Sequence, residues 1–165
     1  TRTGIIDVIK DMGGKITLSD IDQVAKSATI TVETSELKGT EIGGDIIPRL
    51  IDELPIITLL ATQAQGKTVI RDAEELKVKE TDRIAAMHNE LTKVGCRVES
   101  TDDMIKITPP VKLRSAVFDT YKDHRMAMCM SLIAAGGVPV EIRDPNCVRK
   151  TFPDYFERLA GVVEK

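Results

Sequence analysis

An internal repeat limits what this chain can fold into more than any other feature of its sequence. The intervals Asp52–Asp72 and Asp123–Asp144 differ in length by one residue, and each holds an aspartate, an apolar helical pattern, a glycine and a strand-like run ending in Ile-Arg-Asp. A further helical pattern precedes each interval and stops at a glycine, Gly13 or Gly95. Such repetition is typical of units that stack to complete a shared core. We therefore expect two copies of one α/β unit.

Each copy is expected to run in the order helix, strand, strand, helix, strand, which makes the chain mixed α/β (α+β). The copies span approximately residues 1–72 and 73–150, and a C-terminal helix follows within 151–165. Residues 1–165 would then form a single partial domain, since the length suits no more than one. No methionine precedes Met12, and we expect the chain to be a segment of a longer protein.

Hydrophobic periodicity and turn residues locate the elements of each copy. In the first copy we expect a helix over 5–12, strands over 16–18 and 28–32, a glycine-rich connector over 41–45, a helix from 54 to 66 and a strand over 68–71. In the second we expect a helix over 82–94, strands over 97–99 and 104–108, a helix from 123 to 136, a strand over 138–143 and a last helix over 153–163. The alternation of Ala28, Ile30 and Val32 with threonines is typical of a half-buried strand.

The composition indicates a folded chain and excludes several classes of function. Hydrophobic residues make up 42% and charged residues 30%, which excludes wholesale disorder. The formal net charge of −3 argues against a general nucleic-acid-binding protein. Aromatic residues make up 3% and tryptophan is absent, so we expect no surface that stacks bases or sugars.

The cysteines and the apolar segments indicate a protein of the cytoplasm. Cys96, Cys129 and Cys147 are odd in number and widely spaced, which favours neither a zinc site nor a disulfide framework. Cys129 is interpreted as a small core residue. The longest nearly apolar run, 126–140, is too short and too interrupted for a membrane helix, and no leader-like segment opens the chain. We expect no membrane association.

Cationic side chains gather just before or inside the first turn of three predicted helices, within 77–83, 121–125 and 149–154. A helix N-terminus disfavours cations, because its free N–H groups carry partial positive charge. A local preference broken three times, at matching points of a repeat, indicates functional placement. The natural occupant of such a site is a small, multiply charged anion.

Structural explanations stay open for each group taken alone. Ion pairs between neighbours of opposite charge on the surface would account for each cationic group. Asp52 could serve only as the N-cap of the helix that follows it, and His124 could be a partly buried histidine paired with Asp123. His88, at mid-helix outside these groups, is interpreted as structural.

Five segments together carry a resemblance that extends over essentially all 165 residues. They are RTG at 2–4, IDELPI at 51–56, ELKVKETDR at 75–83, DHRMAM at 123–128 and KTFPD at 150–154. In this order they closely resemble the C-terminal portion of the 5-enolpyruvylshikimate-3-phosphate synthase (3-phosphoshikimate 1-carboxyvinyltransferase) family. The motifs VKE-T-DR at 78–83 and DHR-MAM at 123–128 are highly specific to that family.

The resemblance implies a fold and a reaction. Members have two globular domains, each built from three βαβαββ units as an inside-out α/β barrel, with the substrate cleft between them. This chain would supply two of the three units of the C-terminal domain, and the third unit and the N-terminal domain would lie outside it. The family transfers the carboxyvinyl group of phosphoenolpyruvate to the 5-hydroxyl of shikimate 3-phosphate and releases phosphate, in the shikimate pathway to chorismate and the aromatic amino acids. It uses no metal or organic cofactor, and the full-length protein is expected to be a monomer.

Carried over by motif, the resemblance implies roles for seven residues. Asp52 would contact the shikimate hydroxyls and accept a proton, and Lys79 would touch both the attacking hydroxyl and phosphoenolpyruvate. Glu80 would act as the partner acid or base at the methylene carbon. The others would hold phosphoenolpyruvate or support the site: Arg83 and Arg125 at its carboxylate, Lys150 at its phosphate, and His124 beside them.

Two alternatives and one departure accompany the resemblance. The sister transferase that attaches enolpyruvate to UDP-N-acetylglucosamine shares fold and chemistry but lacks the Lys-Glu pair and the Asp-His-Arg run. A non-catalytic module that binds phosphorylated ligands is the alternative of another class, and we expect the isolated chain to turn over negligibly. Glu75 stands where one branch of the family has an asparagine that contacts shikimate 3-phosphate, so no substrate contact is assigned to it.

Overall fold

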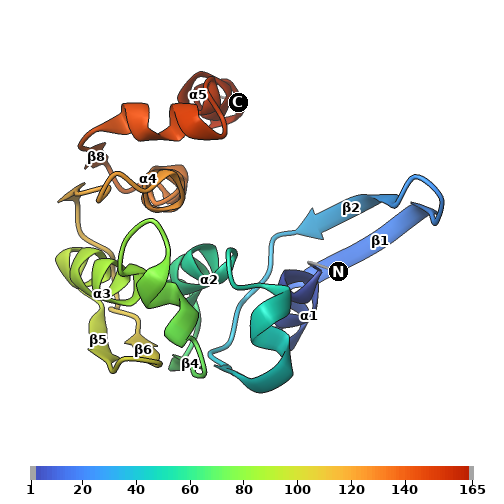
Figure 1. The fold of residues 1–165 in the computed structure, drawn as a ribbon, viewed down its shortest axis with the longest axis horizontal. Coiled ribbons are helices and arrows are strands. Elements are labelled where there is room, and N and C mark those ends of the chain that lie inside the picture. The colour runs from blue at the N-terminus through green and yellow to red at the C-terminus, as the bar shows by residue number, and fades with distance from the viewer. Residues whose placement is uncertain (1–2, 164–165) are drawn as a thin grey trace.

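The computed structural model describes residues 3–163, and Arg2 of the first matching segment and the last two residues of 151–165 lie outside it. The first half contains α1 (Gly4–Asp11), β1 (Lys15–Asp22), β2 (Ser27–Glu33), β3 (Glu41–Ile42), α2 (Leu54–Ala61) and β4 (Thr68–Ile70) (Figure 1). The second half contains α3 (Arg83–Lys93), β5 (Arg97–Ser100), β6 (Ile105–Thr108), β7 (Ala116–Phe118), α4 (His124–Ser131) and β8 (Val140–Ile142), and α5 (Tyr155–Val163) follows. Short 3₁₀ helices lie at Gly44–Arg49, Glu74–Val78, Ala134–Gly136 and Pro145–Lys150.

Both halves use the same order of elements. Each has a helix, an antiparallel hairpin, a short strand, a second helix and a strand parallel to that short strand. Backbone conformations recur as well, since Gly13 and Gly95 both have positive φ (87° and 100°), and so do Asp72 and Asp144 (58° and 48°). The chain is therefore a mixed α/β structure in which one local plan occurs twice.

A single four-stranded sheet joins the two halves, in the order β3-β4-β6-β5. Strand β4 of the first half pairs antiparallel with β6 of the second half, with Ile70 opposite Ile105 and Thr68 opposite Ile107. Helices α2, α3 and α4 pack against one another. The core lies between these helices and the sheet, and includes Leu54, Ile57, Met87, Leu91, Ile105 and Ile107, all fully buried.

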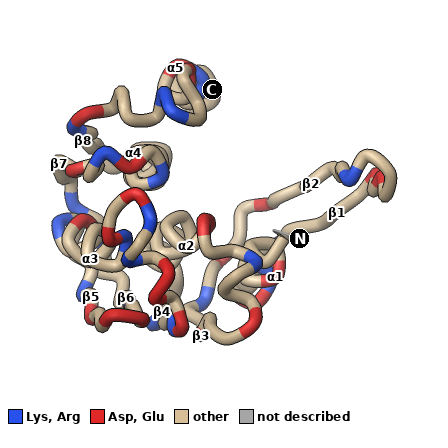
Figure 2. The backbone as a smooth tube through the Cα atoms, in the orientation of Figure 1, with Lys and Arg blue, Asp and Glu red and all other residues tan. Residues whose placement is uncertain are grey.

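The β1–β2 hairpin projects away from this body (Figure 1). Every residue of β2 is exposed, and in β1 only Ile16 is buried. Figure 2 shows that the hairpin is mostly uncharged along its two strands, with charges near its tip and ends. The prediction of a half-buried strand over 28–32 is therefore right about the strand and wrong about its burial.

Several predicted boundaries also differ from the structure. The 41–45 connector contains β3, and β7 is a strand that the sequence analysis missed. Both are short strands whose hydrogen bonds come from distant partners, β4 and β8, so no local periodicity marks them. The helix predicted to reach 66 ends at Ala61, and turns occupy much of the interval before β4.

Helix α5 lies over the end of α4. The Tyr155 hydroxyl is within hydrogen-bond distance of Ser131 Oγ (3.1 Å) and donates to the Met128 carbonyl (2.9 Å). Phe156 and Leu159 are half-buried, so one side of α5 is only partly covered. Within the described part of the chain, none of the helices has the length and apolar character needed to cross a membrane.

Candidate active site

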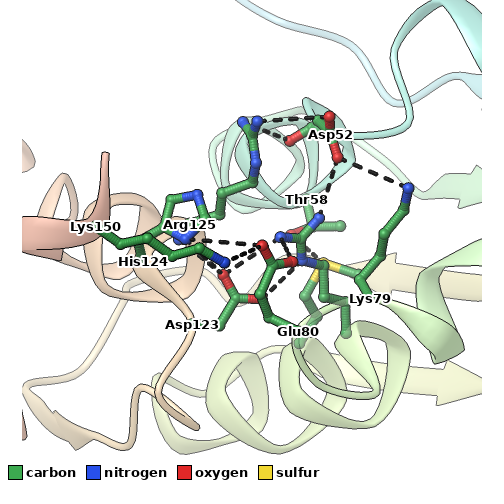
Figure 3. Close-up of polar contacts among 10 residues, drawn as sticks. Asp52, Thr58, Lys79, Glu80, Asp123, His124, Arg125 and Lys150 are labelled. Atoms are coloured by element: carbon green, nitrogen blue, oxygen red, sulfur yellow. Dashed lines mark hydrogen bonds and ion pairs between the residues drawn. The ribbon is translucent and has the colours of Figure 1, made fainter. Parts of the chain in front are cut away.

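Four chain segments bring their ionisable side chains together at one place (Figure 3). Asp52 comes from the turn before α2, and Lys79 and Glu80 come from the turn before α3. Asp123 and Arg125 lie at the start of α4. Arg83, the first residue of α3, pairs with carboxylates from three of these segments. His124 and Lys150 complete the group.

Arg83 forms the centre of this group. Its side chain is 1% exposed, and its Nε donates to Asp123 Oδ2 at 2.8 Å. Nη2 donates to Glu80 Oε2 at 2.8 Å, and Nη1 lies 3.4 Å from Asp52 Oδ1. Burial alone would lower the pKa of the guanidinium, but the hydrogen bonds and charge of Asp123, with the charges of Glu80 and Asp52, outweigh it and raise the pKa. Arg83 is therefore a buried cation shared by three carboxylates.

Asp123 has two roles that hold the site in place. Its side chain is fully buried, and it accepts from the backbone N–H of Arg125 at 2.8 Å, which caps α4. The same carboxylate accepts two hydrogen bonds from Arg83. From the sequence, Asp123 is predicted only as a helix start and as a possible partner of His124. The cations predicted at the start of α3 could have indicated the second role of Asp123, because a cation that becomes buried needs an acidic partner.

Asp52 does not cap α2. That helix begins at Leu54, its N-cap is Glu53, and no side chain makes a capping hydrogen bond there. Instead the Asp52 carboxylate lies 3.5 Å from Arg125 Nη2 and 4.0 Å from Lys79 Nζ, in addition to its contact with Arg83. The capping interpretation is wrong, because the chain is still in a turn at Glu53, which takes the N-cap position directly before Leu54.

Glu80 bridges the turn before α3 and the end of the 3₁₀ helix Pro145–Lys150. Lys150 Nζ donates to Glu80 Oε1 at 3.2 Å, and Arg83 binds the other carboxylate oxygen. Partial burial acts to raise the pKa of Glu80, but a backbone N–H, Lys150 and Arg83 outweigh it and hold the pKa below its usual 4.5. At neutral pH this carboxyl is ionised and can accept a proton.

His124 is buried between the acidic groups without a hydrogen bond at Nδ1 from any described residue. That nitrogen lies 3.9 Å from Asp123 Oδ1 and 4.0 Å from Glu80 Oε1. Burial is the main reason that the pKa of His124 falls below its ordinary 6.5, although both carboxylates act in the opposite direction. The imidazole is therefore neutral at neutral pH and does not add a charge to the group.

The cations differ in how far a ligand could reach them. The side chains of Lys79, Arg125 and Lys150 are 27%, 30% and 63% exposed, whereas Arg83 is enclosed by carboxylates. A pocket of about 190 Å³ lies beside Asp52 and Arg125, but its other lining is largely apolar, with Ile56, Met128, Cys129, Leu132 and Tyr155 among it. A small polyanion would find its counter-charges at the partly exposed cations rather than inside this pocket.

The structure thus brings all seven predicted site residues together and keeps His88 outside the group. His88 Nδ1 lies 2.8 Å from Ser100 Oγ on β5. Cys129 is buried, and burial raises the pKa of its thiol to about 12, which suits a core residue rather than a nucleophile.

Known proteins match the chain over almost its whole length. The family model for EPSP synthase (3-phosphoshikimate 1-carboxyvinyltransferase) matches residues 1–159. Two curated relatives are named 3-phosphoshikimate 1-carboxyvinyltransferase. The one from Streptococcus thermophilus (strain CNRZ 1066) is 64% identical to this chain over 166 aligned residues, and the one from Streptococcus sanguinis (strain SK36) is 56% identical over 165. Each alignment covers 99% of this chain and 39% of the relative, so the chain spans well under half the length of these relatives.

Solved structures agree with this assignment. An EPSP synthase from Acinetobacter baumannii superposes with a TM-score of 0.87 at 32% identity, over 98% of this chain and 39% of that one. The enolpyruvyl transferase NikO from Streptomyces tendae superposes with a TM-score of 0.70 at 22% identity, over 96% of this chain and 34% of that one, and shows that the fold is shared more widely. By motif, by sequence and by structure, the chain belongs to the EPSP synthase family.

Proposed function

We propose that the protein to which this chain contributes transfers the carboxyvinyl group of phosphoenolpyruvate to the 5-hydroxyl of shikimate 3-phosphate and releases phosphate. The observation that carries the proposal is the convergence of four cations and three carboxylates from segments as far apart as Asp52 and Lys150; two of the carboxylates, Asp52 and Glu80, are partly exposed. Phosphoenolpyruvate carries a carboxylate and a phosphate on three carbons, so it needs several cations within a short distance.

The partly exposed cations would hold the two anionic ends of phosphoenolpyruvate. Arg125 can offer its planar guanidinium to the carboxylate, and Lys150 and Lys79 offer point charges. Arg83 is 1% exposed and bound to carboxylates, so a direct ligand contact would require Asp52 or Glu80 to move away from it. In the absence of such a movement, Arg83 orients the two carboxylates.

The reaction needs two proton movements in each direction, and the two carboxylates can serve them. The 5-hydroxyl oxygen bonds to C2 of phosphoenolpyruvate while Asp52 takes the hydroxyl proton and Glu80 delivers a proton to the methylene carbon. The resulting tetrahedral intermediate then returns a proton from that methyl group to Glu80, and its C2–O bond to phosphate breaks, which restores the double bond. The departing phosphate takes up the proton held by Asp52, so both carboxylates return to their starting states. Glu80 must be protonated to begin this sequence, and the proton would arrive with the substrates, since free Glu80 is ionised at neutral pH.

The activity is also expected to depend on the part of the relatives that this chain does not cover. Because the chain covers 39% of them, further substrate contacts and the groups that close over the site would come from the remainder. We expect the isolated chain to bind phosphoenolpyruvate weakly and in a salt-dependent way through its exposed cations, and to release no phosphate.

A chimaera tests the proposal. This chain replaces the corresponding segment of the Streptococcus thermophilus relative, and phosphate release is measured with phosphoenolpyruvate and shikimate 3-phosphate. We expect turnover by the chimaera, a loss of about 100-fold or more for Lys79→Gln, and little change for the neighbouring Lys77→Gln. Lys77 is the matched control because its Nζ binds Asp102 at 2.6 Å, outside the group.

Two results would contradict the proposal. An active chimaera that is unaffected by Lys79→Gln would separate the charged group from the reaction. Phosphate release with UDP-N-acetylglucosamine in place of shikimate 3-phosphate would assign the sister activity instead.

In the same chimaera, Asp52→Asn should reduce kcat far more than it raises KM, since the carboxylate acts on a proton rather than on binding alone.

A further inference from the structure

The turn just before α4 has an unusual backbone conformation. Tyr121 and Lys122 both have positive φ (54° and 57°), although neither is a glycine. The N–H of Asp123 donates to the Thr120 carbonyl at 2.8 Å, so Tyr121 and Lys122 are the centre of a tight turn. Turns with positive φ at both central positions are dominated by glycine, asparagine and aspartate. A tyrosine and a lysine adopt this conformation only where other contacts hold them in it.

A buried carboxylate on α3 supplies such contacts. The Glu90 side chain is fully buried, and its Oε1 accepts a hydrogen bond from the Tyr121 hydroxyl at 2.7 Å. Its Oε2 accepts from the Asp119 backbone N–H at 3.1 Å and from Lys93 Nζ at 2.6 Å. Lys93 balances the charge of the carboxylate, which could not otherwise remain buried. Glu90 therefore holds the chain on both sides of Thr120, through a backbone group and through a tyrosine side chain.

The turn connects this buried carboxylate to the candidate active site. Asp123, at the end of the turn, accepts from Arg83 at 2.8 Å, and Arg83 lies seven residues before Glu90 on α3. Seven residues are about two turns of a helix, so Arg83 and Glu90 lie on the same side of α3. The segment that begins α4 is thus attached to α3 at two points, Tyr121 and Asp123. Arg125 follows two residues later, so its position depends on this attachment.

The first half of the chain shows that the repeated fold does not need this arrangement. Counted from the equivalent glycines and aspartates of the two halves, Val8 stands where Glu90 does, and Leu50 stands where Tyr121 does. Val8 and Leu50 are buried aliphatic residues, and Leu50 has a φ of −149°. The first half therefore fills the equivalent positions with apolar side chains and without a left-handed backbone at Leu50. The Glu90–Tyr121 pair occurs in the half whose helix carries Arg125.

We propose that Glu90 is a positioning residue for the carboxyvinyl transfer, because through the Tyr121 hydroxyl it holds the turn in the left-handed conformation that sets Arg125 at the site. The inference rests on the proposed function, in which Arg125 binds the carboxylate of phosphoenolpyruvate. Without the hydrogen bond, residues 121–122 would relax toward negative φ and move the start of α4. Arg125 lies 3.5 Å from the Asp52 carboxylate, so a small displacement would misplace its guanidinium. The fraction of molecules ready to bind phosphoenolpyruvate would then fall.

The chimaera described above tests this inference with Tyr121→Phe and Glu90→Gln. Each substitution removes or weakens the one hydrogen bond and nearly keeps the size of the side chain. We expect the KM for phosphoenolpyruvate to rise about 5- to 20-fold and the KM for shikimate 3-phosphate to stay within about twofold. The double variant should be no worse than the more affected single variant, because both act on the same contact.

Two controls separate a loss of position from a loss of stability. A variant that is only less stable loses active molecules, which lowers kcat and leaves both KM values unchanged. Ile105→Ala opens a cavity at the four-stranded sheet, and Tyr155→Phe removes a hydroxyl that donates to the Met128 carbonyl at 2.9 Å, nearer the other end of α4. We expect neither control to raise the KM for phosphoenolpyruvate by more than about twofold.

A second substitution tests whether the turn carries the effect. Lys122→Asn introduces a residue type that adopts positive φ more readily than lysine. Added to Tyr121→Phe, it should lower the KM for phosphoenolpyruvate again by at least about threefold, because the turn is then held without Glu90. The same substitution in the unaltered chimaera should lower that KM far less, since the hydrogen bond already holds the turn. A contact that only stabilised the fold would not be replaced in this way.

Several kinetic results would overturn the proposal. One is an active chimaera in which Tyr121→Phe and Glu90→Gln both leave the KM for phosphoenolpyruvate within about twofold. Another is an equal rise of that KM in the two controls. A third is a set of additive effects in the double variant together with no recovery by Lys122→Asn, since the hydrogen bond would then not act through the turn.

A crystal structure of the Tyr121→Phe chimaera gives a readout that does not depend on activity. We expect residues 121–122 to leave the left-handed region and Arg125 to separate from Asp52. Positive φ at both residues, with Arg125 in its present place, would overturn the proposal. A chimaera that releases no phosphate before any substitution would instead contradict the proposed function, and the crystal structure would still decide whether Glu90 holds the turn.

Discussion

The β1–β2 and β5–β6 hairpins follow the same pattern of alternating aliphatic residues after a glycine with positive φ. The second hairpin is half of a four-stranded sheet, and its isoleucines Ile105 and Ile107 have no exposed surface. The first stands apart from the body, and Ile30 and Val32 remain more than half exposed. The difference lies in the neighbour rather than in the hairpin, because β6 has β4 beside it and β2 has no such strand among the described residues.

This comparison teaches that an alternating pattern identifies a strand with an apolar face but not the surface that covers it. The halves that contain the two hairpins are joined by the β4–β6 pairing and by the charged group around Arg83. In that group, Asp52 comes from the first half and Asp123 from the second. Stability measurements can therefore separate the contribution of this junction from that of each hairpin.

The largest expected effect comes from breaking the junction itself. Arg83→Met should lower the free energy of unfolding by about 3–5 kcal/mol, because it leaves the carboxylate of Asp123 buried without its cation. Urea denaturation followed by circular dichroism measures the change. Arg71→Met is the control, since Arg71 pairs with Glu41 on the surface and should contribute about 1 kcal/mol or less. Equal losses in the two variants would mean that the junction does not hold the halves together.

The matched pair Ile105→Ala and Ile30→Ala tests the comparison of hairpins directly. Ile105→Ala should cost about 2–5 kcal/mol because it opens a cavity in the core. Ile30→Ala removes the same atoms from an exposed position and should change stability by about 0.5 kcal/mol or less at protein concentrations where the chain is monomeric. If Ile30→Ala were as costly under those conditions, the hairpin would be packed against the body in solution.

The two equivalent glycines are positions where the halves should behave alike. Gly13→Ala and Gly95→Ala should each cost about 1–2 kcal/mol, because both residues have positive φ, where a Cβ is disfavoured. An added Cβ would lie 3.5 Å from the Glu36 carbonyl oxygen at Gly13 and 3.2 Å from Arg114 Nε at Gly95, so the second should be slightly more costly. A neutral effect at Gly13 alone would show that the first hairpin does not depend on its turn.

The smallest expected effect is the contribution of His124 to the pH dependence of the free energy of unfolding. The folded-state pKa of His124 is lowered, chiefly by burial, so the unfolded chain takes up a proton first as the pH falls through 6.5. Stability should therefore decrease below about pH 6.5, with a slope from this residue of at most about 1.4 kcal/mol per pH unit. His124→Gln should reduce the slope between pH 8 and 5.5, and His88→Gln, outside the group, should leave it in place. An unchanged slope in His124→Gln would assign the dependence to other residues.

Local signals predicted many of the elements. The predicted helix starts at 82 and 123 fall on the N-caps Asp82 and Asp123, and the predicted stops at Gly13 and Gly95 fall in the turns after α1 and α3. Such signals succeed because capping and left-handed turns depend on residues within a few positions of one another. Strands β3 and β7 were missed because each is defined by a partner beyond a helix and connecting turns.

The candidate site divides in the same way. The excess of cations at helix starts pointed to Lys79, Arg83, Arg125 and Lys150, with His124, and to an anionic ligand. The enclosure of Arg83 by three carboxylates, and the full burial of Asp123, depend on how α3, α4 and the turn before α2 meet. No spacing along the chain encodes these contacts.

By itself the sequence determined the repeat, the periodicity of most helices and strands, and the residue types that gather at the site, since these depend on local backbone preferences and on side-chain chemistry. Only the tertiary structure decided which hairpin is covered, that Asp123 both caps a helix and binds Arg83 while Asp52 only binds cations, and which cations remain open to a ligand. The physical reason is that burial and electrostatic contact are set by neighbours distant in the chain, and the same aliphatic pattern can be a core or a surface according to what packs against it.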